Sequence, residues 1–211
     1  AQDADITLRL YIFLKDRLVK ENMISLYETI ERPLPNVIAY MERNGVGINS
    51  NYLKNLSSIF INKMNPIKEK IFNLAGEEFN ISSPKQLAEI LYNKLGLKGG
   101  KKGKSGLYST SAAVLEKLSQ DGNEICQLIL EWRALQKLKS TYSDALVDQI
   151  NPVTKRVHSH FQMTGAMTGR FSSSNPNLQN IPIKTEDGRA IRRAFIAEEN
   201  KKIVACDYSQ I

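Results

Sequence analysis

The chain of 211 residues contains little cysteine, little histidine and no long hydrophobic run. Its two cysteines lie far apart, Cys126 in a helical pattern and Cys206 in an apolar run, so both are expected to be reduced, buried thiols. His158 and His160 have no cysteine or acid at ligand spacing, which argues against a zinc site. No apolar run is long enough to span a membrane, and the charged N-terminal residues are unlike a signal peptide. We therefore expect a cytoplasmic protein without a membrane partner.

Acidic residues are outnumbered by basic ones. The 29 Lys and Arg against 22 Asp and Glu give a formal net charge of +7. This balance favours a polyanionic partner such as nucleic acid, although an ordinary solvated basic surface produces the same count. The hydrophobic content of 42% is enough for the core of one or two domains.

Two stretches near the end carry chemically informative residues. Residues 168–180 are nearly free of acid and offer one guanidinium, several hydroxyls and four side-chain amides. Such donors contact backbone oxygens and minor-groove acceptors of a duplex. Further on, the apolar run 203–206 predicts a buried strand that delivers Asp207 at its end, where a carboxylate can hold Mg²⁺. The plainer interpretation is a carboxylate that caps a strand.

Helical periodicity dominates the first half of the chain. Residues 3–21 show a broad apolar face, and residues 34–44 repeat apolar positions until Gly45 offers a C-cap. From residue 49 to residue 76 the apolar positions alternate steps of three and four, which predicts one long helix with a kink or a break at Pro66.

A second long helix is expected over residues 123–149, antiparallel to the first. Between the two, hydroxyl-rich cap signals at 82–84 and 109–111 predict two short helices. The glycine- and lysine-rich segment 96–106 cannot bury apolar area and is expected to be mobile; it is either a solvated linker or a tip that contacts a polyanion. After residue 152, alternating apolar positions over 157–163 predict a strand.

Four ordered motifs resemble family A DNA polymerases of the bacterial polymerase I type. They read Thr-Gly-Arg-x-Ser-Ser at 168–173, Pro-Asn-Leu-Gln-Asn-Ile-Pro at 176–182, Arg-Arg-Ala-Phe at 192–195 and Asp-Tyr-Ser-Gln-Ile at 207–211. The resemblance extends upstream over essentially the whole chain and includes Leu-Gln-Lys-Leu-Lys-Ser-Thr-Tyr at 135–142. It implies a DNA-directed DNA polymerase, a nucleotidyltransferase of DNA replication and repair.

The resemblance implies a mainly α fold with a small α+β part. Residues 1–30 would be the end of an exonuclease-like domain and a linking helix. Residues 31–152 would form a helical thumb on two long antiparallel helices, with a mobile basic tip at about 96–106. Residues 153–211 would begin the palm sheet and stop within its first metal-binding motif. Both ends look cut, so the chain is expected to be a fragment that grips DNA and is inactive alone.

The resemblance also assigns roles to residues of this chain. Asp207 and Arg170 would be catalytic, with Asp207 and the backbone carbonyl of Tyr208 binding Mg²⁺ in a two-metal site that only the full-length protein completes. Asn177 and Gln179 would hold the template side, and Arg192 would brace the palm. The expected DNA contacts are Ser82, Ser83, Ser109, Thr110, Ser111, Arg133, Lys137, Lys139, Ser140, Thr141, Arg170, Asn177 and Gln179. The expected nucleotide contacts are Ser209, Gln210 and Ile211.

Several alternatives stay open on the sequence. Asp3 either binds metal in an exonuclease site, as the resemblance suggests, or favours a helix N-terminus. The basic helix face is either a phosphate contact or a solvated surface. Two residues depart from the family pattern. Ala166 replaces a threonine, so a hydroxyl expected at a primer-side contact is missing. Lys184 stands where bacterial relatives often carry arginine, which keeps the charge but loses the bidentate fork. The expected partners are primer–template DNA and deoxynucleoside triphosphates, for a nucleoid-associated monomer. The alternative functions are a non-catalytic nucleic-acid-binding helical module, or a phage or organellar family A polymerase.

Overall fold

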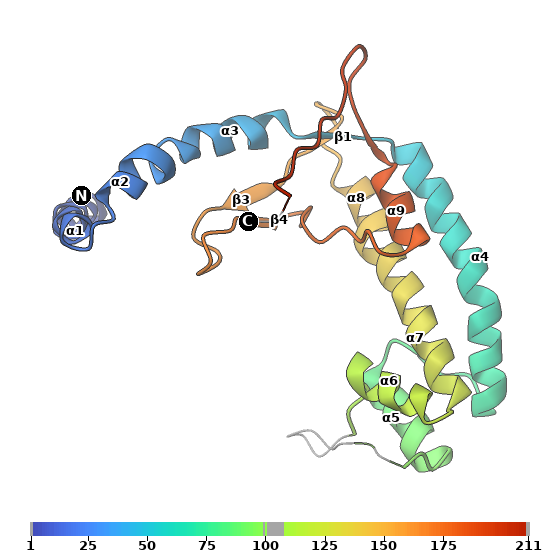
Figure 1. Ribbon diagram of the computed structural model, residues 1–211. Coiled ribbons are helices and arrows are strands. Elements are labelled where there is room, and N and C mark those ends of the chain that lie inside the picture. Colours follow the sequence, from blue (N-terminus) through green and yellow to red (C-terminus); the bar gives the residue numbers. More distant parts are fainter. Residues whose placement is uncertain (1, 99, 101–107, 210–211) are drawn as a thin grey trace. The chain divides into compact units, whose positions relative to one another are not determined.

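The computed structural model describes residues 2–98, 100 and 108–209, and helices dominate it (Figure 1). The chain divides into two compact units, which are described separately. The first comprises Ala1–Val46 and Arg156–Gln179, and the second comprises Gly47–Lys155 and Asn180–Ile211. Strands are few and short, so the mainly α fold with a small α+β part is confirmed. No helix within these ranges is long and apolar enough to cross a membrane.

The first unit begins with helices and ends with a small hairpin. Its helices are α1 (Gln2–Lys20), α2 (Ile24–Leu26), the π-helix η1 (Tyr27–Glu31) and α3 (Leu34–Asn44). Its strands are β2 (Arg156–Val157), β3 (His160–Gln162) and β4 (Ser172–Ser174). Gly45 ends α3 with a φ of 61°, as the predicted C-cap requires. α1 forms where a helix was predicted, but none of its side chains is buried.

A serine cluster holds the hairpin of the first unit together. β3 and β4 pair antiparallel with Phe161 opposite Ser173. The buried Ser159 hydroxyl donates to the Pro176 carbonyl at 2.6 Å and lies 2.7 Å from the Ser173 hydroxyl. Glu42 of α3 accepts the Phe161 N–H at 2.6 Å, so the helix and hairpin are tied. The predicted single strand over 157–163 is therefore two short strands, because Ser159 leaves the ladder to bond elsewhere.

The second unit is built on two long helical segments (Figure 1). Its helices are α4 (Ser50–Ala75), α5 (Pro84–Ala88), the π-helix η2 (Glu89–Lys94), α6 (Ala112–Gln120), α7 (Glu124–Lys137), the π-helix η3 (Leu138–Asp144), α8 (Ala145–Asp148) and α9 (Glu186–Arg192). β1 (Val46–Ile48) pairs antiparallel with β5 (Phe195–Ile196), with Gly47 opposite Ile196.

Local signals in the sequence set both ends of α4. The Asn49 side chain accepts the Tyr52 N–H at 3.0 Å at the N-terminus, and Gly76 closes the helix in the left-handed region with a φ of 73°. Of the predicted kink or break at Pro66, the break does not occur, because the helix runs through this residue without interruption. A proline removes one backbone hydrogen bond, and the buried stripe on either side of Pro66 compensates that loss.

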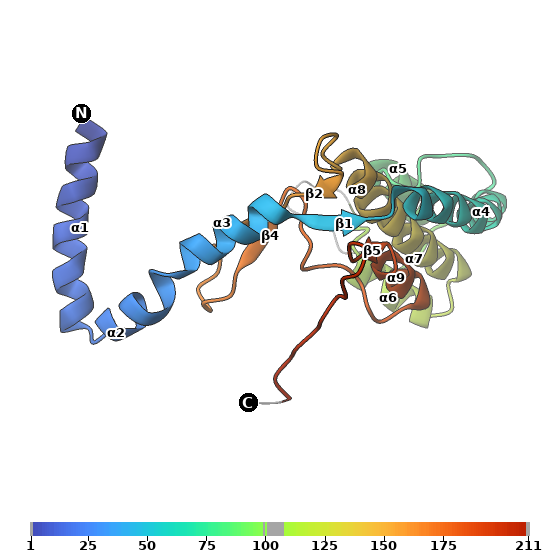
Figure 2. The same cartoon turned by 90° about the horizontal axis from the view of Figure 1, so that it is seen from above.

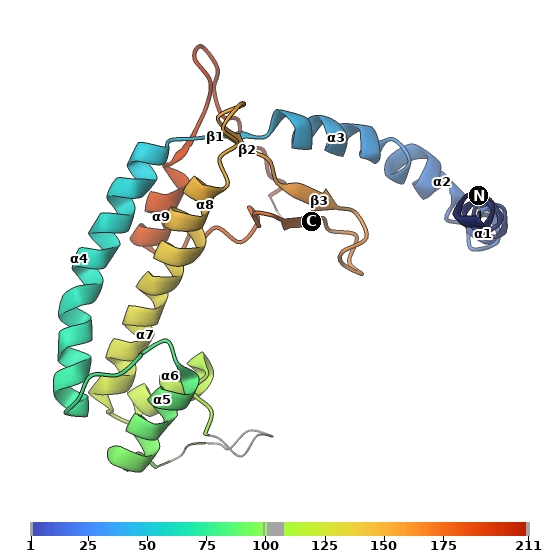
Figure 3. The ribbon, with the colours of Figure 1, turned by 180° about the vertical axis from the view of Figure 1, so that it is seen from behind.

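Packing of α4 against α7, η3 and α8 forms the core of the second unit. The two segments lie side by side and run in opposite directions, as Figures 1 and 3 show, which confirms the predicted antiparallel pair. Phe60 and Ile71 of α4 and Ile129 of α7 are fully buried. Each such side chain contributes about 1.5–3 kcal/mol relative to an exposed one. The π-helical turn η3 was not predicted, since its wider hydrogen bonding leaves no periodicity signal.

The last segment corrects a prediction. Residues 203–206 form no strand, and Ile203 and Val204 are 63% and 79% exposed. Figure 2 shows the segment after β5 as an irregular trace. A strand needs a neighbouring strand to satisfy its backbone groups, and the described residues offer none here. Cys206 is exposed, so its predicted burial is wrong, whereas that of Cys126 is confirmed.

Candidate nucleic-acid interface

A row of polar side chains follows one face of α7 and η3. Lys137, Ser140 and Thr141 are exposed and lie three and four residues apart, so they share that face with Arg133 one turn earlier. The Ser140 hydroxyl donates to the Gln136 carbonyl at 2.8 Å and keeps an acceptor lone pair. Within the described parts of the chain, Lys137 makes no ion pair, so its charge is available to an anion.

Arg133 is part-buried and links two loops. Its guanidinium donates to the Thr110 carbonyl at 2.7 Å and, more weakly, to the Ile81 carbonyl at 3.5 Å. Burial lowers the pKa of Arg133, yet a guanidinium remains charged at any physiological pH. Carbonyls do not neutralise that charge, so Arg133 both holds the loops and contributes positive potential.

The two loops that Arg133 joins carry the hydroxyl groups expected to contact DNA. Ser83 is the N-cap of α5 and accepts the Gln86 N–H at 3.4 Å, while Ser82 before it is exposed. In the second loop, the hydroxyl of Ser109 donates to that of Ser111 at 3.3 Å. Thr110 is 7% exposed. The structure thus brings both hydroxyl-rich loops to the guanidinium of Arg133. It buries the side chain of Thr110.

Lys139 differs from Lys137 because its charge is already paired. Its ammonium lies 2.6 Å from an oxygen of Asp144, and the other oxygen of Asp144 accepts the Ser57 hydroxyl at 2.7 Å. The lysine side chain is 22% exposed. This group ties η3 to α4, a role that the helical spacing did not reveal because Ser57 is distant in sequence.

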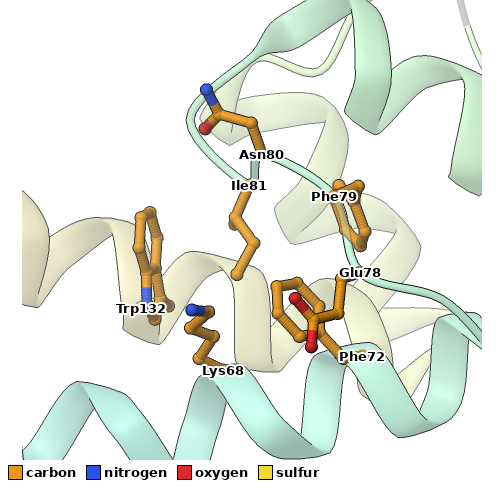
Figure 4. A pocket seen from close by; sticks show the side chains of 7 residues that line it. All are labelled: Lys68, Phe72, Glu78, Phe79, Asn80, Ile81 and Trp132. Carbon is orange, nitrogen blue, oxygen red and sulfur yellow. The ribbon is translucent and has the colours of Figure 1, made fainter.

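A pocket of about 450 Å³ is lined by residues of α4, by Trp132 of α7 and by the loop over residues 78–81 (Figure 4). Trp132 lies on one side of it and Phe72 with Phe79 on the other, with the Lys68 ammonium between them. Buried Ile81 lines its wall, and the Ile81 carbonyl is the one that Arg133 contacts. The rings of Phe72 and Phe79 pack with their centroids 5.6 Å apart, which ties α4 to the loop that carries Ser82.

A further set of contacts involves residues 180–184. The Tyr142 hydroxyl donates to the Asn180 carbonyl at 2.5 Å, and Arg192 of α9 donates to the Ile181 carbonyl at 3.1 Å. Arg192 was expected to act as a brace, whereas Tyr142 was named only as the last residue of the motif at 135–142. A tyrosine at a core position signals a buried hydroxyl that needs a partner, and this is the signal that sequence reasoning missed.

The first unit carries the polar motif residues. Arg170, Asn177 and Gln179 are all exposed. Asn177 accepts the Gln179 N–H at 3.0 Å, a local turn that fixes the spacing of these two side chains. Gly169 directly precedes Arg170 with a φ of 73°, a conformation that requires glycine there.

The expected metal-binding residues lie in different parts of the chain. Asp207, Tyr208 and Ser209 are exposed in irregular structure, and Asp3 is exposed in the first turn of α1. Among the described residues no cluster of three or more His, Cys, Asp or Glu could hold a metal ion. The carboxylate of Asp207 and the carbonyl of Tyr208 are oxygen donors of the kind that Mg²⁺ prefers, but they supply only part of a coordination shell. Gln210 and Ile211, expected to bind nucleotide, lie outside the described residues, as does most of the segment 96–106.

Comparison with protein families gives a match over most of the chain. Residues 50–211 match the sequence model described as DNA polymerase family A. The chain is 50% identical over its whole length to DNA polymerase I of Rhizobium leguminosarum, and 48% identical over 210 residues to the thermostable DNA polymerase I of Thermus aquaticus. It covers 21% and 25% of those two proteins, so it spans about a fifth to a quarter of their length.

A solved structure has a similar fold. It is the POL domain of Pol1 from M. smegmatis in complex with DNA primer-template and dNTP. The TM-score is 0.81 with 37% sequence identity, over 91% of this chain and 34% of that one.

Proposed function

Because the chain belongs to DNA polymerase family A, we propose that it is the part of a DNA polymerase I that grips the primer–template duplex and supplies one metal-binding carboxylate. The observation that carries the proposal is the placement of Arg133. It draws together the two hydroxyl-rich loops beside the exposed row formed by Lys137, Ser140 and Thr141. Cations and hydroxyls that follow one helix face are suited to phosphates of a duplex, whatever the base sequence.

The individual contacts follow from exposure and charge. Lys137 and Arg133 attract phosphates, and the hydroxyls of Ser140 and Thr141 bond to phosphate oxygens. Lys139 adds less, since Asp144 balances its charge. The remaining hydroxyl groups and the first N–H groups of α6 offer neutral donors to the same strand. The loop contacts are Ser82, Ser83, Ser109, Thr110 and Ser111, with Thr110 acting through its backbone.

The reaction of the parent enzyme would be template-directed nucleotidyl transfer. The primer 3′ oxygen attacks the α-phosphorus of a deoxynucleoside triphosphate, a P–O bond forms, and pyrophosphate leaves. Asp207 and the carbonyl of Tyr208 would hold Mg²⁺, which supplies charge neutralisation and activation of the 3′ oxygen when bound. Ser209, Gln210 and Ile211 would line the nucleotide site.

The motif residues of the first unit would test and hold the new base pair. Arg170 reaches minor-groove acceptors that every correct Watson–Crick pair presents, so it senses pair geometry without reading sequence. Asn177 and Gln179 hold the template side. The primer-template and dNTP in the M. smegmatis complex support these partners. We further propose a monomeric enzyme that acts at the nucleoid.

Binding of primed duplex DNA to the 211-residue chain tests the proposal. We expect weak binding without sequence preference, and no template-directed incorporation, because a single carboxylate cannot organise two metal ions. Replacing Lys137 by Ala should flatten the slope of log K against log salt by about 0.9, the value of one phosphate contact. The matched control is Lys20→Ala in the last turn of α1, which should leave the slope unchanged. Equal slopes for both variants, or no binding at all, would overturn the proposed grip.

A further inference from the structure

The backbone of residues 180–184, here called the strap, is held at its start by a buried tyrosine. The Tyr142 hydroxyl of η3 donates to the Asn180 carbonyl at 2.5 Å, across 38 residues of sequence. The Tyr142 side chain is 4% exposed, and its burial raises the pKa of the hydroxyl, which therefore stays protonated as a donor. This bond commits one carbonyl of the strap to the long helical segment.

Two arginines of α9 hold the carbonyls that follow. Arg192 donates to the carbonyls of Ile181 at 3.1 Å and Pro182 at 3.4 Å. Arg189 donates to the carbonyls of Lys184 at 3.2 Å and residue 183 at 3.4 Å. Each guanidinium thus donates to two adjacent carbonyls, with one hydrogen bond of ordinary length and one longer hydrogen bond. With Tyr142, all five consecutive carbonyls of the strap accept from side chains.

The helix that carries these arginines is itself fixed. Asp187 in its first turn accepts from Lys63 of α4 at 2.7 Å, and the buried Ile191 anchors its inner face. Gly188 packs directly on the strap, since a Cβ at this position would lie 2.7 Å from the Cβ of Pro182. The donors that hold the strap therefore cannot move freely with it.

The strap lies in the sequence next to residues that are proposed to contact DNA. It follows directly after Gln179 and ends at Lys184, whose exposed ammonium has no partner among the described residues. We propose that Tyr142, Arg189 and Arg192 are positioning residues, which hold the strap so that Lys184 meets the primer–template at a fixed position. This inference rests on the proposed function and assigns a role to groups that do not themselves touch DNA. A segment ordered before binding loses less entropy when it engages its ligand.

Replacement of Tyr142 by Phe in the complete polymerase tests the proposal, because it removes only the hydroxyl. In single-turnover experiments the maximal rate of correct incorporation should fall roughly tenfold, because the loss of the Tyr142 hydrogen bond leaves the start of the strap less firmly held. The Kd for primed duplex should change less than about twofold, because Arg133 and Lys137, the cations proposed to attract phosphates, are unchanged. Tyr11→Phe, which removes an exposed hydroxyl on α1, is the matched control and should leave both values unchanged.

Arginine variants separate positioning from folding. Arg192→Lys should retain part of the rate, because one nitrogen cannot occupy the positions of both Nε and Nη2, whereas Arg192→Ala should lose more. The loss for Tyr142→Phe combined with Arg192→Ala should be smaller than the product of the single losses, because both act on one strap. A lowered melting temperature with a normal rate per folded molecule would overturn the positioning role. A native enzyme that binds no primed DNA would overturn the proposed function itself.

Discussion

The guanidinium of Arg133 and the backbone carbonyl of Thr110 lie 2.7 Å apart, and this bond joins α7 to the loop that precedes α6. The same guanidinium reaches the Ile81 carbonyl from its other side. A residue expected to contact phosphate is thus also a structural tie. The two roles predict different results, because a contact with phosphate depends on the salt concentration and a hydrogen bond to a backbone carbonyl depends on it far less.

Replacing Arg133 by Ala should lower both stability and DNA affinity. Removing a charged donor leaves two carbonyls without their partner, which should cost about 1.5–3 kcal/mol in the free energy of unfolding. Urea titration of the 211-residue chain measures this cost. Arg133→Lys should keep the salt slope of DNA binding but recover little stability, because an ammonium lacks the planar fork. If Arg133→Ala did not lower the free energy of unfolding, the hydrogen bond between Arg133 and the Thr110 carbonyl would not contribute to stability.

Lys139 and Lys137 should respond in opposite ways to the same substitution. Lys139→Ala removes the partner of Asp144 and should cost about 1 kcal/mol of stability, the upper end for a pair that is not fully buried. Its effect on the salt slope should be less than half that of Lys137→Ala, because the lysine and the carboxylate together release few counterions. Lys137→Ala should leave the urea midpoint unchanged. Equal salt slopes for the two variants would show that Lys139 contacts phosphate despite its ion pair.

The thiols should also differ. Burial raises the pKa of Cys126 to about 11, whereas Cys206 is exposed. The thiolate is the reactive form, so a thiol reagent at pH 8 should label one cysteine in the folded chain and two in denaturant. Unfolded Cys126 loses its proton near its ordinary pKa while the folded state keeps it, so this group should lower stability as pH rises from about 9 to 11. Rapid labelling of Cys126 in the folded chain would contradict its burial.

Helices and their caps could be predicted because their signals are local. Asn49, Gly76 and Ser83 act on backbone groups within a few residues, and the alternating apolar steps of α4 show which face is buried. The pairing of the two long segments followed, since both carry one apolar stripe. The same logic failed for residues 203–206, because an apolar run indicates a strand only where a partner strand is present.

The hydrogen-bond and ion-pair partners of polar side chains could not be predicted from the spacing of residues in the sequence. Arg133, Lys137 and Lys139 look alike in the sequence. Arg133 ties two loops, Lys137 has no ion pair among the described residues, and Lys139 is paired with Asp144. What distinguishes them is the position of Thr110 and Asp144, and helical periodicity carries no information on such contacts. The bond from Tyr142 to Asn180 belongs to the same class.

Arg170 offers a clear contrast between a functional and a structural role in the complete polymerase. It is exposed and makes no hydrogen bond or ion pair with another described residue, so removing it should leave the melting temperature nearly unchanged. A guanidinium in the minor groove contributes only when a correct pair places its acceptor within reach, and its energy should therefore appear in the transition state. Arg170→Ala should raise the barrier to incorporation by about 1–3 kcal/mol, the value of a good charged base contact, with substrate binding less affected.

Single-turnover kinetics on matched and mismatched primer ends, run beside a melting curve, decide between the two roles. The loss should be large on matched ends and small on mismatched ends, because a distorted pair already denies the arginine its acceptor. Arg170→Lys should restore little, since a point charge lacks the fork. The chain supplies a matched control in Arg9→Ala on α1, another exposed arginine, which should change neither rate nor melting temperature. If Arg170→Ala lowered the melting temperature and left the rate on matched ends normal, the arginine would support the fold, and the sensing of pair geometry would have to lie elsewhere.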